Sequence, residues 1–139
     1  RPVIFLEAPG FDSEREQLEI TKKLENWLHK ASTKKLQIFG ILYLHRITDV
    51  KLSSPPIRHL TLLRTLCEKS IGGFPNRVVL VTTMWANMKD AGTGERREQE
   101  LQKHWSTFPQ GSAVSGLMRF QNSSESAAEI VRALIRNSN

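Results

Sequence analysis

Residues 77–83 read Arg-Val-Val-Leu-Val-Thr-Thr, and this run of valines and threonines is typical of a β-strand. Three further short apolar runs predict strands at 3–6, at 38–44 and, more weakly, at 117–120. The run at 3–6 has no polar alternation, which indicates a strand covered on both faces, as in a parallel sheet. The strand at 38–44 is expected to be the deepest.

The segments between these strands show helical periodicity. In the first helix the expected apolar stripe includes Leu18, Leu24, Trp27 and Leu28. Ser123 or Ser124 is expected to cap the last helix. The expected helices span 14–30, 57–69, 94–105 and 124–137.

Strands that alternate with helices predict an α/β fold with a parallel sheet. Ligands of such sheets bind outside the carboxyl ends of the strands. The segments to search for function are therefore 7–12, 45–49, 84–90 and 121–124.

Length and composition set further bounds. A chain of 139 residues with 39% hydrophobic and 24% charged residues suits one globular domain, 1–139. Its longest apolar run, at 38–44, is far shorter than the roughly 20 residues of a membrane span, and no signal peptide opens the sequence. The one cysteine, Cys67, has no disulfide partner, so a cytoplasmic protein is expected.

The chain is basic, with 20 Lys+Arg against 14 Asp+Glu and a net charge of +6. Such a balance suits a polyanionic partner. The basic residues are nevertheless spread along the chain, which favours a solvated surface over a nucleic-acid-binding stripe. A basic nucleic-acid-binding domain remains an alternative.

The expected loops carry a resemblance. They read Leu-Glu-Ala-Pro-Gly-Phe-Asp at 6–12, Gly-Ile-Leu-Tyr-Leu-His-Arg-Ile-Thr-Asp at 40–49, Val-Leu-Val-Thr-Thr-Met-Trp at 79–85 and Gly-Glu-Arg-Arg-Glu at 94–98. This succession resembles the G domain of P-loop GTPase-like proteins in the septin/AIG1-like branch that is expanded in fungi. Members typically show D-T-P-G-F-D-D, G-I-L-Y-L-H-R-I-S-D, V-L-V-T-T-M-W-D and G-E-R-R-E-x-E-L, in that order.

The resemblance implies a three-layer α/β/α, P-loop NTPase-like domain that lacks its N-terminal strand, P-loop and helix. It implies GTP and Mg²⁺ as ligands in the full family context. The positions matched to the nucleotide site are Glu7, Gly10, His45, Thr83, Trp85 and Asn87, with Glu7 also near the metal.

Several departures weaken that site. No G-x-x-x-x-G-K-[ST] run is present to cradle phosphates. Glu7 replaces the family's aspartate, and Phe11 stands where Ras-type enzymes have a water-orienting glutamine. Ala86 replaces the aspartate that reads guanine, although Asn87 lies beside it. No catalytic residue is therefore assigned, and no tight cofactor is expected.

Several of these positions also have plainer interpretations. Glu7 suits a solvated strand end, and His45 with Arg46 suits a surface pair at a turn. Thr83 fits strand propensity alone, and Arg96 and Arg97 suit a charged helix face with Glu100 close by. The tryptophans, including Trp85, are expected to pack rather than to stack on a base.

The sequence thus predicts a G-domain fragment that binds guanine nucleotide weakly or not at all and acts as a binding or regulatory module. Its expected partner is a protein or a second copy of itself, and nucleic acid is disfavoured. The alternative is a GTPase whose P-loop lies upstream of Arg1.

Overall fold

A computed structural model describes residues 4–7, 14–36, 38–49, 61–62, 64–69, 78–106 and 114–136. The chain divides into two compact units, which are considered separately. The smaller unit holds Arg1–Gln37 and Thr61–Phe74, and the larger holds Ile38–Leu60 and Pro75–Asn139.

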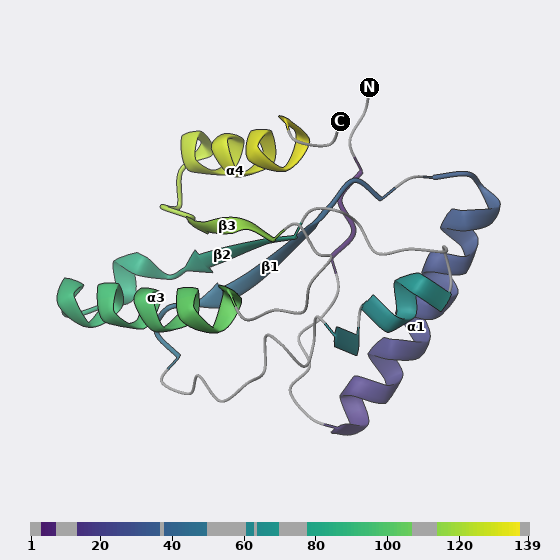
Figure 1. Ribbon diagram of the computed structural model, residues 1–139, viewed down its shortest axis with the longest axis horizontal. Coiled ribbons are helices and arrows are strands. Elements are labelled where there is room, and N and C mark those ends of the chain that lie inside the picture. The colour runs from purple at the N-terminus through teal and green to yellow at the C-terminus, as the bar shows by residue number, and fades with distance from the viewer. Residues whose placement is uncertain are drawn as a thin grey trace. The chain divides into compact units, whose positions relative to one another are not determined.

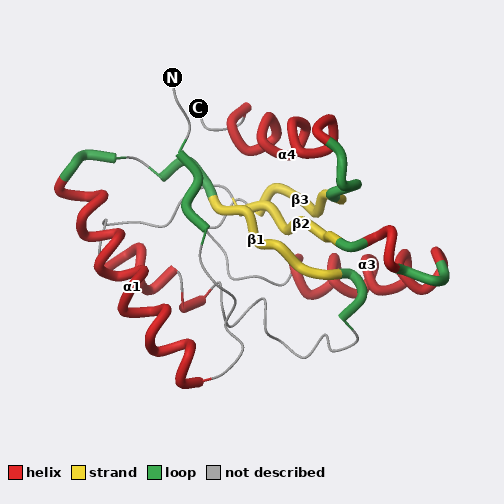
Figure 2. Tube along the Cα trace, turned by 180° about the vertical axis from the view of Figure 1, so that it is seen from behind, coloured by secondary structure: helices red, strands yellow, loops and turns green. Residues whose placement is uncertain are grey.

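The larger unit contains a parallel sheet of three strands in the order β1-β2-β3. The strands are β1 (Ile41–Arg46), β2 (Val78–Thr83) and β3 (Val114–Arg119). Two helices, α3 (Ala91–Ser106) and α4 (Ser124–Arg136), lie on opposite faces of this sheet (Figure 1). The view from behind shows the same three layers (Figure 2). The predicted α/β fold with a parallel sheet is therefore confirmed.

The core of this unit is built on β2, whose residues Val78 to Val81 are almost completely buried. Val79 and Val81 face α4 and pack with Ile130, Leu42 and Met118. The intervening residues face the opposite side, where α3 lies. β2 is buried because it is paired on both edges and covered on both faces.

The prediction that the strand near residues 38–44 lies deepest is wrong. The observed strand, β1, begins three residues later and is only half-buried, with Leu44 and Arg46 exposed. Its bounds follow the pairing from Ile41↔Val78 to Arg46↔Thr83. Apolar composition signals burial but does not show which strand lies in the centre, and here the centre belongs to β2.

The smaller unit contains α1 (Glu14–Thr33), and residues 61–62 and 64–69 are also helical. Ile20, Leu28 and Ala31 are buried along α1, as are Leu66 and Cys67 of the second helical segment. An ion pair of 2.9 Å joins Lys69 Nζ to Glu25 Oε1. The predicted helix at 14–30 is confirmed and continues for three more residues, but Leu18 is exposed and lies off its buried stripe.

The strand predicted at 3–6 is not formed by its described residues. Ile4 to Leu6 have no strand structure and are exposed, at 74%, 68% and 48%. A strand needs a hydrogen-bonded neighbour, and an apolar run alone does not supply one. Val3 lies outside the described residues.

Candidate functional site

The carboxyl ends of the three parallel strands lie at one edge of the sheet, as the fold class requires. The register pairs His45 of β1 with Thr82 of β2, and Thr82 with Arg119 of β3. We call these three residues the polar row. Register partners on neighbouring strands project from the same face, here the face that carries α3. The sheet thus gathers an imidazole, a hydroxyl and a guanidinium from distant parts of the chain.

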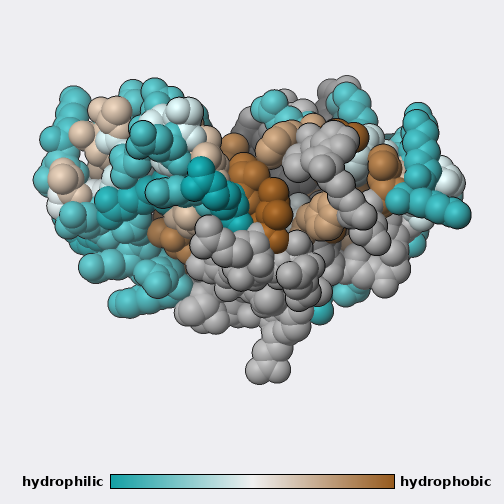
Figure 3. Space-filling view, turned by 90° about the horizontal axis from the view of Figure 1, so that it is seen from above, coloured by the Kyte–Doolittle hydropathy of each residue, from teal (hydrophilic) through white to brown (hydrophobic). Residues whose placement is uncertain are grey.

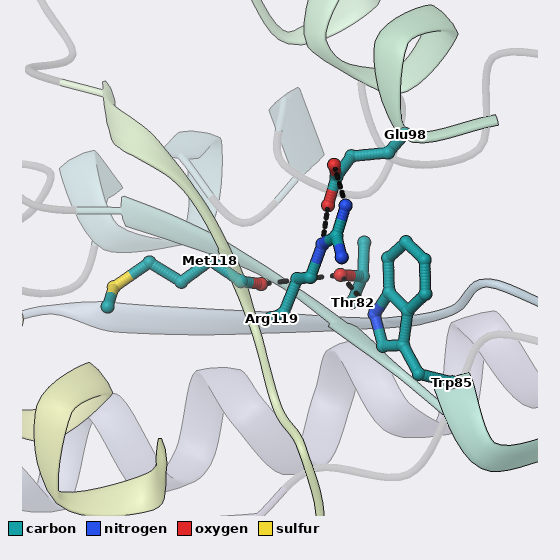
Figure 4. Close-up of polar contacts among 5 residues, drawn as sticks. All are labelled: Thr82, Trp85, Glu98, Met118 and Arg119. Atoms are coloured by element: carbon teal, nitrogen blue, oxygen red, sulfur yellow. Dashed lines mark hydrogen bonds and ion pairs between the residues drawn. The ribbon is translucent and has the colours of Figure 1, made fainter. Parts of the chain in front are cut away.

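Thr82 stands at the centre of the row and is completely buried. Its hydroxyl accepts a hydrogen bond of 2.9 Å from the Trp85 indole N–H and lies 3.4 Å from the Met118 carbonyl oxygen, to which it donates (Figure 4). A buried hydroxyl needs such partners, since an unpaired one costs roughly 1–3 kcal/mol. Thr82 therefore links β3 and the turn after β2.

That turn directs the indole back onto the sheet. Met84 adopts a left-handed conformation with φ of 65°, and the short helix η1 (Trp85–Asn87) follows. The Trp85 ring then packs against α3 at Gly94, where an added Cβ would come within 2.8 Å of Cζ3. A side chain at position 94 would therefore collide with the ring.

Arg119 covers Trp85 and carries a strong ion pair. Its guanidinium carbon lies 4.0 Å from the indole ring centroid, a cation–π distance. Two hydrogen bonds of 2.7 Å, from Nε and Nη2, join it to the Glu98 carboxylate in a bidentate arrangement (Figure 4). These bonds raise the pKa of Arg119. The indole is consequently held through both its N–H and its π-face.

The β1 end of the row is less enclosed. Burial lowers the pKa of His45, and Arg46 adds to this effect while Asp49 opposes it. Arg46 forms an exposed ion pair with Asp49 at 3.4 Å. Burial and Arg46 thus favour the neutral imidazole of His45.

Arg97 fastens the loop after β1. Its Nη1 donates a hydrogen bond of 3.0 Å to the carbonyl oxygen of Ile47, a residue only 1% exposed. The backbone N–H of Ile47 donates in turn to the Thr83 carbonyl oxygen at 3.0 Å. Arg97 thus ties α3 to this loop and is neither a purely solvated residue nor one directed at a ligand.

The structure brings together some of the residues expected at a nucleotide site. Thr83 ends β2, and Trp85 and Asn87 lie in the turn that follows, where Asn87 is exposed beside the exposed Ala86. His45 lies in the same sheet through its pairing with Thr82. Glu7 is exposed and belongs to the smaller unit, and Gly10 lies outside the described residues.

The sequence interpretation assigned no binding role to three residues around Trp85: Thr82, Glu98 and Arg119. One signal was available, since Arg119 is a charge within the apolar run Leu-Met-Arg-Phe at 117–120. Such a residue in a covered strand needs a partner of opposite charge. Its partner Glu98 sits in the charged run at 94–98, where several residues were equally plausible.

Two further properties concern only the described part of the chain. Its histidine, cysteine, aspartate and glutamate side chains nowhere form a group of three that could hold a metal ion. None of its helices has both the length and the apolar character needed to cross a membrane.

Comparisons with family models, with curated proteins and with solved structures found no match to this chain.

Proposed function

We propose that this chain is a G-domain-like binding module with low affinity for guanine nucleotides, which acts through contacts with another protein chain. The proposal combines the order of the motifs with the geometry of the turn after β2. In the resemblance, this turn carries the group that reads the base. Here that turn has an exposed Ala86 and an indole already engaged by Thr82 and Arg119.

The engaged indole is the observation that carries the proposal. Arg119 covers one face of the Trp85 ring, so a base that stacked on that face would have to displace the cation–π contact. The methyl group of Ala86 offers no acceptor for the guanine N–H groups. Without phosphate contacts as well, we expect binding of GTP no tighter than about millimolar.

Exposed hydrophobic side chains support a role in protein binding. Within the larger unit Leu44 is 64% exposed, Phe39 47% and Met84 44%. Hydrophobic residues also reach the surface on the side seen from above (Figure 3). A partner chain that covered these side chains would remove their apolar surface from water, which favours association.

Restoring a carboxylate tests the proposal. Calorimetric titration with Mg²⁺-GTP is expected to show millimolar or weaker binding to the parent chain. Ala86→Asp is expected to strengthen GTP binding at least about tenfold, since a hydrogen bond to a charged group contributes roughly 1.5–3 kcal/mol. ATP binding should not improve, because adenine lacks the donors that this carboxylate would read.

The matched control is Asn87→Asp, which adds the same charge at the next exposed position and should not favour GTP. Micromolar GTP binding by the parent chain would refute the low affinity. Equal effects of Ala86→Asp on GTP and ATP would refute the placement of the base-reading position.

A further inference from the structure

The guanidinium of Arg119 is held as a flat group with two parallel N–H donors. Its Nε and Nη2 each donate a hydrogen bond of 2.7 Å to one oxygen of the Glu98 carboxylate. The same guanidinium lies 4.0 Å from the centroid of the Trp85 ring (Figure 4). Trp85 and Glu98 together therefore bind a planar group, one through its face and the other through its paired donors.

Guanine presents the same chemistry at one edge of its ring. Its N1–H and its exocyclic amino group point the same way from neighbouring atoms, as two N–H groups of a guanidinium do, so one carboxylate can accept from both. The flat base can also stack on an indole. Adenine stacks as well, but it has an acceptor nitrogen in place of the N1–H. The contacts that hold Arg119 are thus those that would distinguish guanine from adenine.

The ring and the carboxylate are positioned by more than Arg119. The buried Thr82 hydroxyl holds the Trp85 N–H at 2.9 Å, and the ring packs against Gly94. Glu98 lies four residues after Gly94 in α3, so both project from one face of that helix. The Arg119 side chain is 37% exposed and that of Glu98 18%. A molecule that took the place of the guanidinium would therefore reach it from solvent.

We propose that Trp85 and Glu98 form a guanine-reading position separate from residue 86, which Arg119 occupies in cis and so keeps closed. The inference rests on the low affinity for guanine nucleotides proposed above and gives that affinity a cause within the site. A guanidinium carries a full charge and is attached beside the carboxylate, whereas guanine is neutral and binds from solution. Arg119 is consequently favoured over the base, and its removal opens the position.

The first test removes the occupant. GMP and AMP are titrated into Arg119→Ala, and the indole N–H resonance of Trp85 reports binding beside the ring. Both nucleotides carry the same ribose and phosphate, so the ratio of their Kd values reports the base alone. We expect Arg119→Ala to bind GMP at least about tenfold more tightly than the parent chain does, and at least about tenfold more tightly than it binds AMP.

Two control variants identify the acceptor. Arg119→Ala combined with Glu98→Gln leaves the ring uncovered but replaces the carboxylate, and it should bind GMP and AMP alike. Arg132→Ala removes the same charge from an exposed position of α4, on the opposite face of the sheet, and should match the parent chain (Figure 1). Equal Kd values for the two nucleotides in Arg119→Ala, or a preference for GMP that survives Glu98→Gln, would overturn the proposal.

The second test uses stability, because Arg119→Ala also takes a partner from the Glu98 carboxylate. Methylguanidinium at about 20 mM is expected to raise the Tm of Arg119→Ala by at least about 3 °C, since a ligand that binds only the folded state stabilises it. Methylammonium has the charge without the paired donors and should not. Equal shifts with the two cations would overturn the site. A shift with methylguanidinium but no preference for GMP would overturn guanine as its ligand.

The outcome is separable from that of the proposed function. The low affinity for GTP is measured on the parent chain and on variants at Ala86, whereas the closed position is measured on variants at Arg119 and Glu98. Micromolar GTP binding by the parent chain refutes the first. Equal GMP and AMP binding by Arg119→Ala, with a parent chain that binds GTP weakly, refutes only the second.

Discussion

At the scale of single residues, the position of Trp85 in the turn after β2 depends on a glycine in α3. Gly94 leaves room for the Trp85 ring, which would otherwise meet a Cβ at 2.8 Å. Sequence alone did not indicate this role, and the third helix was predicted to begin at Gly94. It begins at Ala91, because Asp90 caps it: Oδ1 accepts from the Gly92 N–H and Oδ2 from the Thr93 hydroxyl.

Gly94→Ala is expected to destabilise the larger unit even though alanine favours helices. The helix gains up to about 1 kcal/mol from the substitution, but overpacking against an aromatic ring costs roughly 1–3 kcal/mol. We expect a net loss of about 1 kcal/mol by urea unfolding, with altered Trp85 fluorescence as the ring moves.

Gly92→Ala is the control for this prediction. A Cβ there would meet only Asp90 Oδ1 at 3.5 Å, an ordinary contact. The substitution should therefore be neutral or stabilising by up to about 1 kcal/mol. If both glycine variants gain stability equally, the ring does not pack against α3 as described.

At the scale of elements, periodicity located helices more reliably than apolar runs located strands. α4 was predicted at 124–137 and is observed from Ser124 to Arg136. The described residues of the predicted helix at 57–69 are also helical. A helix forms its backbone hydrogen bonds within its own segment, so its pattern is local. A strand depends on a partner elsewhere, which is why residues 4–6 were mispredicted and β1 was displaced.

The cap of α4 illustrates what remained undecided in the sequence. Both Ser123 and Ser124 were candidates, and the structure selects Ser123, whose Oγ accepts from the Ser126 N–H at 3.1 Å. The buried Ser126 hydroxyl accepts from the Gln121 N–H at 3.0 Å and so anchors the turn. Two serines therefore connect the end of β3 to the start of α4.

Ser123→Ala should cost about 1 kcal/mol of stability, the usual loss of an N-cap. Ser124→Ala, at the adjacent exposed position, should change stability by less than about 0.5 kcal/mol. Urea unfolding of the two variants side by side gives the comparison. A larger loss from Ser124→Ala would mean that the cap is misassigned.

At the scale of the whole molecule, one domain over 1–139 stays a prediction, and the structure is described as two compact units. Of the candidate site, the closeness of Thr83, Trp85 and Asn87 at the end of β2 follows from their order in the sequence, and their part in binding stays a prediction. The Arg119–Glu98 pair did not follow, since it depends on how α3 and β3 meet.

The two units carry separate reporters, which leads to a prediction about their unfolding. Cys67 in the smaller unit is 1% exposed, and burial raises the pKa of its thiol to about 11. At pH 8 the native thiol is thus almost wholly protonated and unreactive, so its reaction with a disulfide reagent reports opening of that unit.

Trp85 in the larger unit reports its own surroundings once Trp27 and Trp105 are replaced by phenylalanine. We expect the urea midpoint for Cys67 reactivity to lie below the midpoint of the Trp85 fluorescence transition. The reason is that a smaller unit buries a smaller share of its surface. A Cys67→Ser variant supplies the reagent blank. Coincident midpoints for the two reporters would instead show that the units unfold as one cooperative structure.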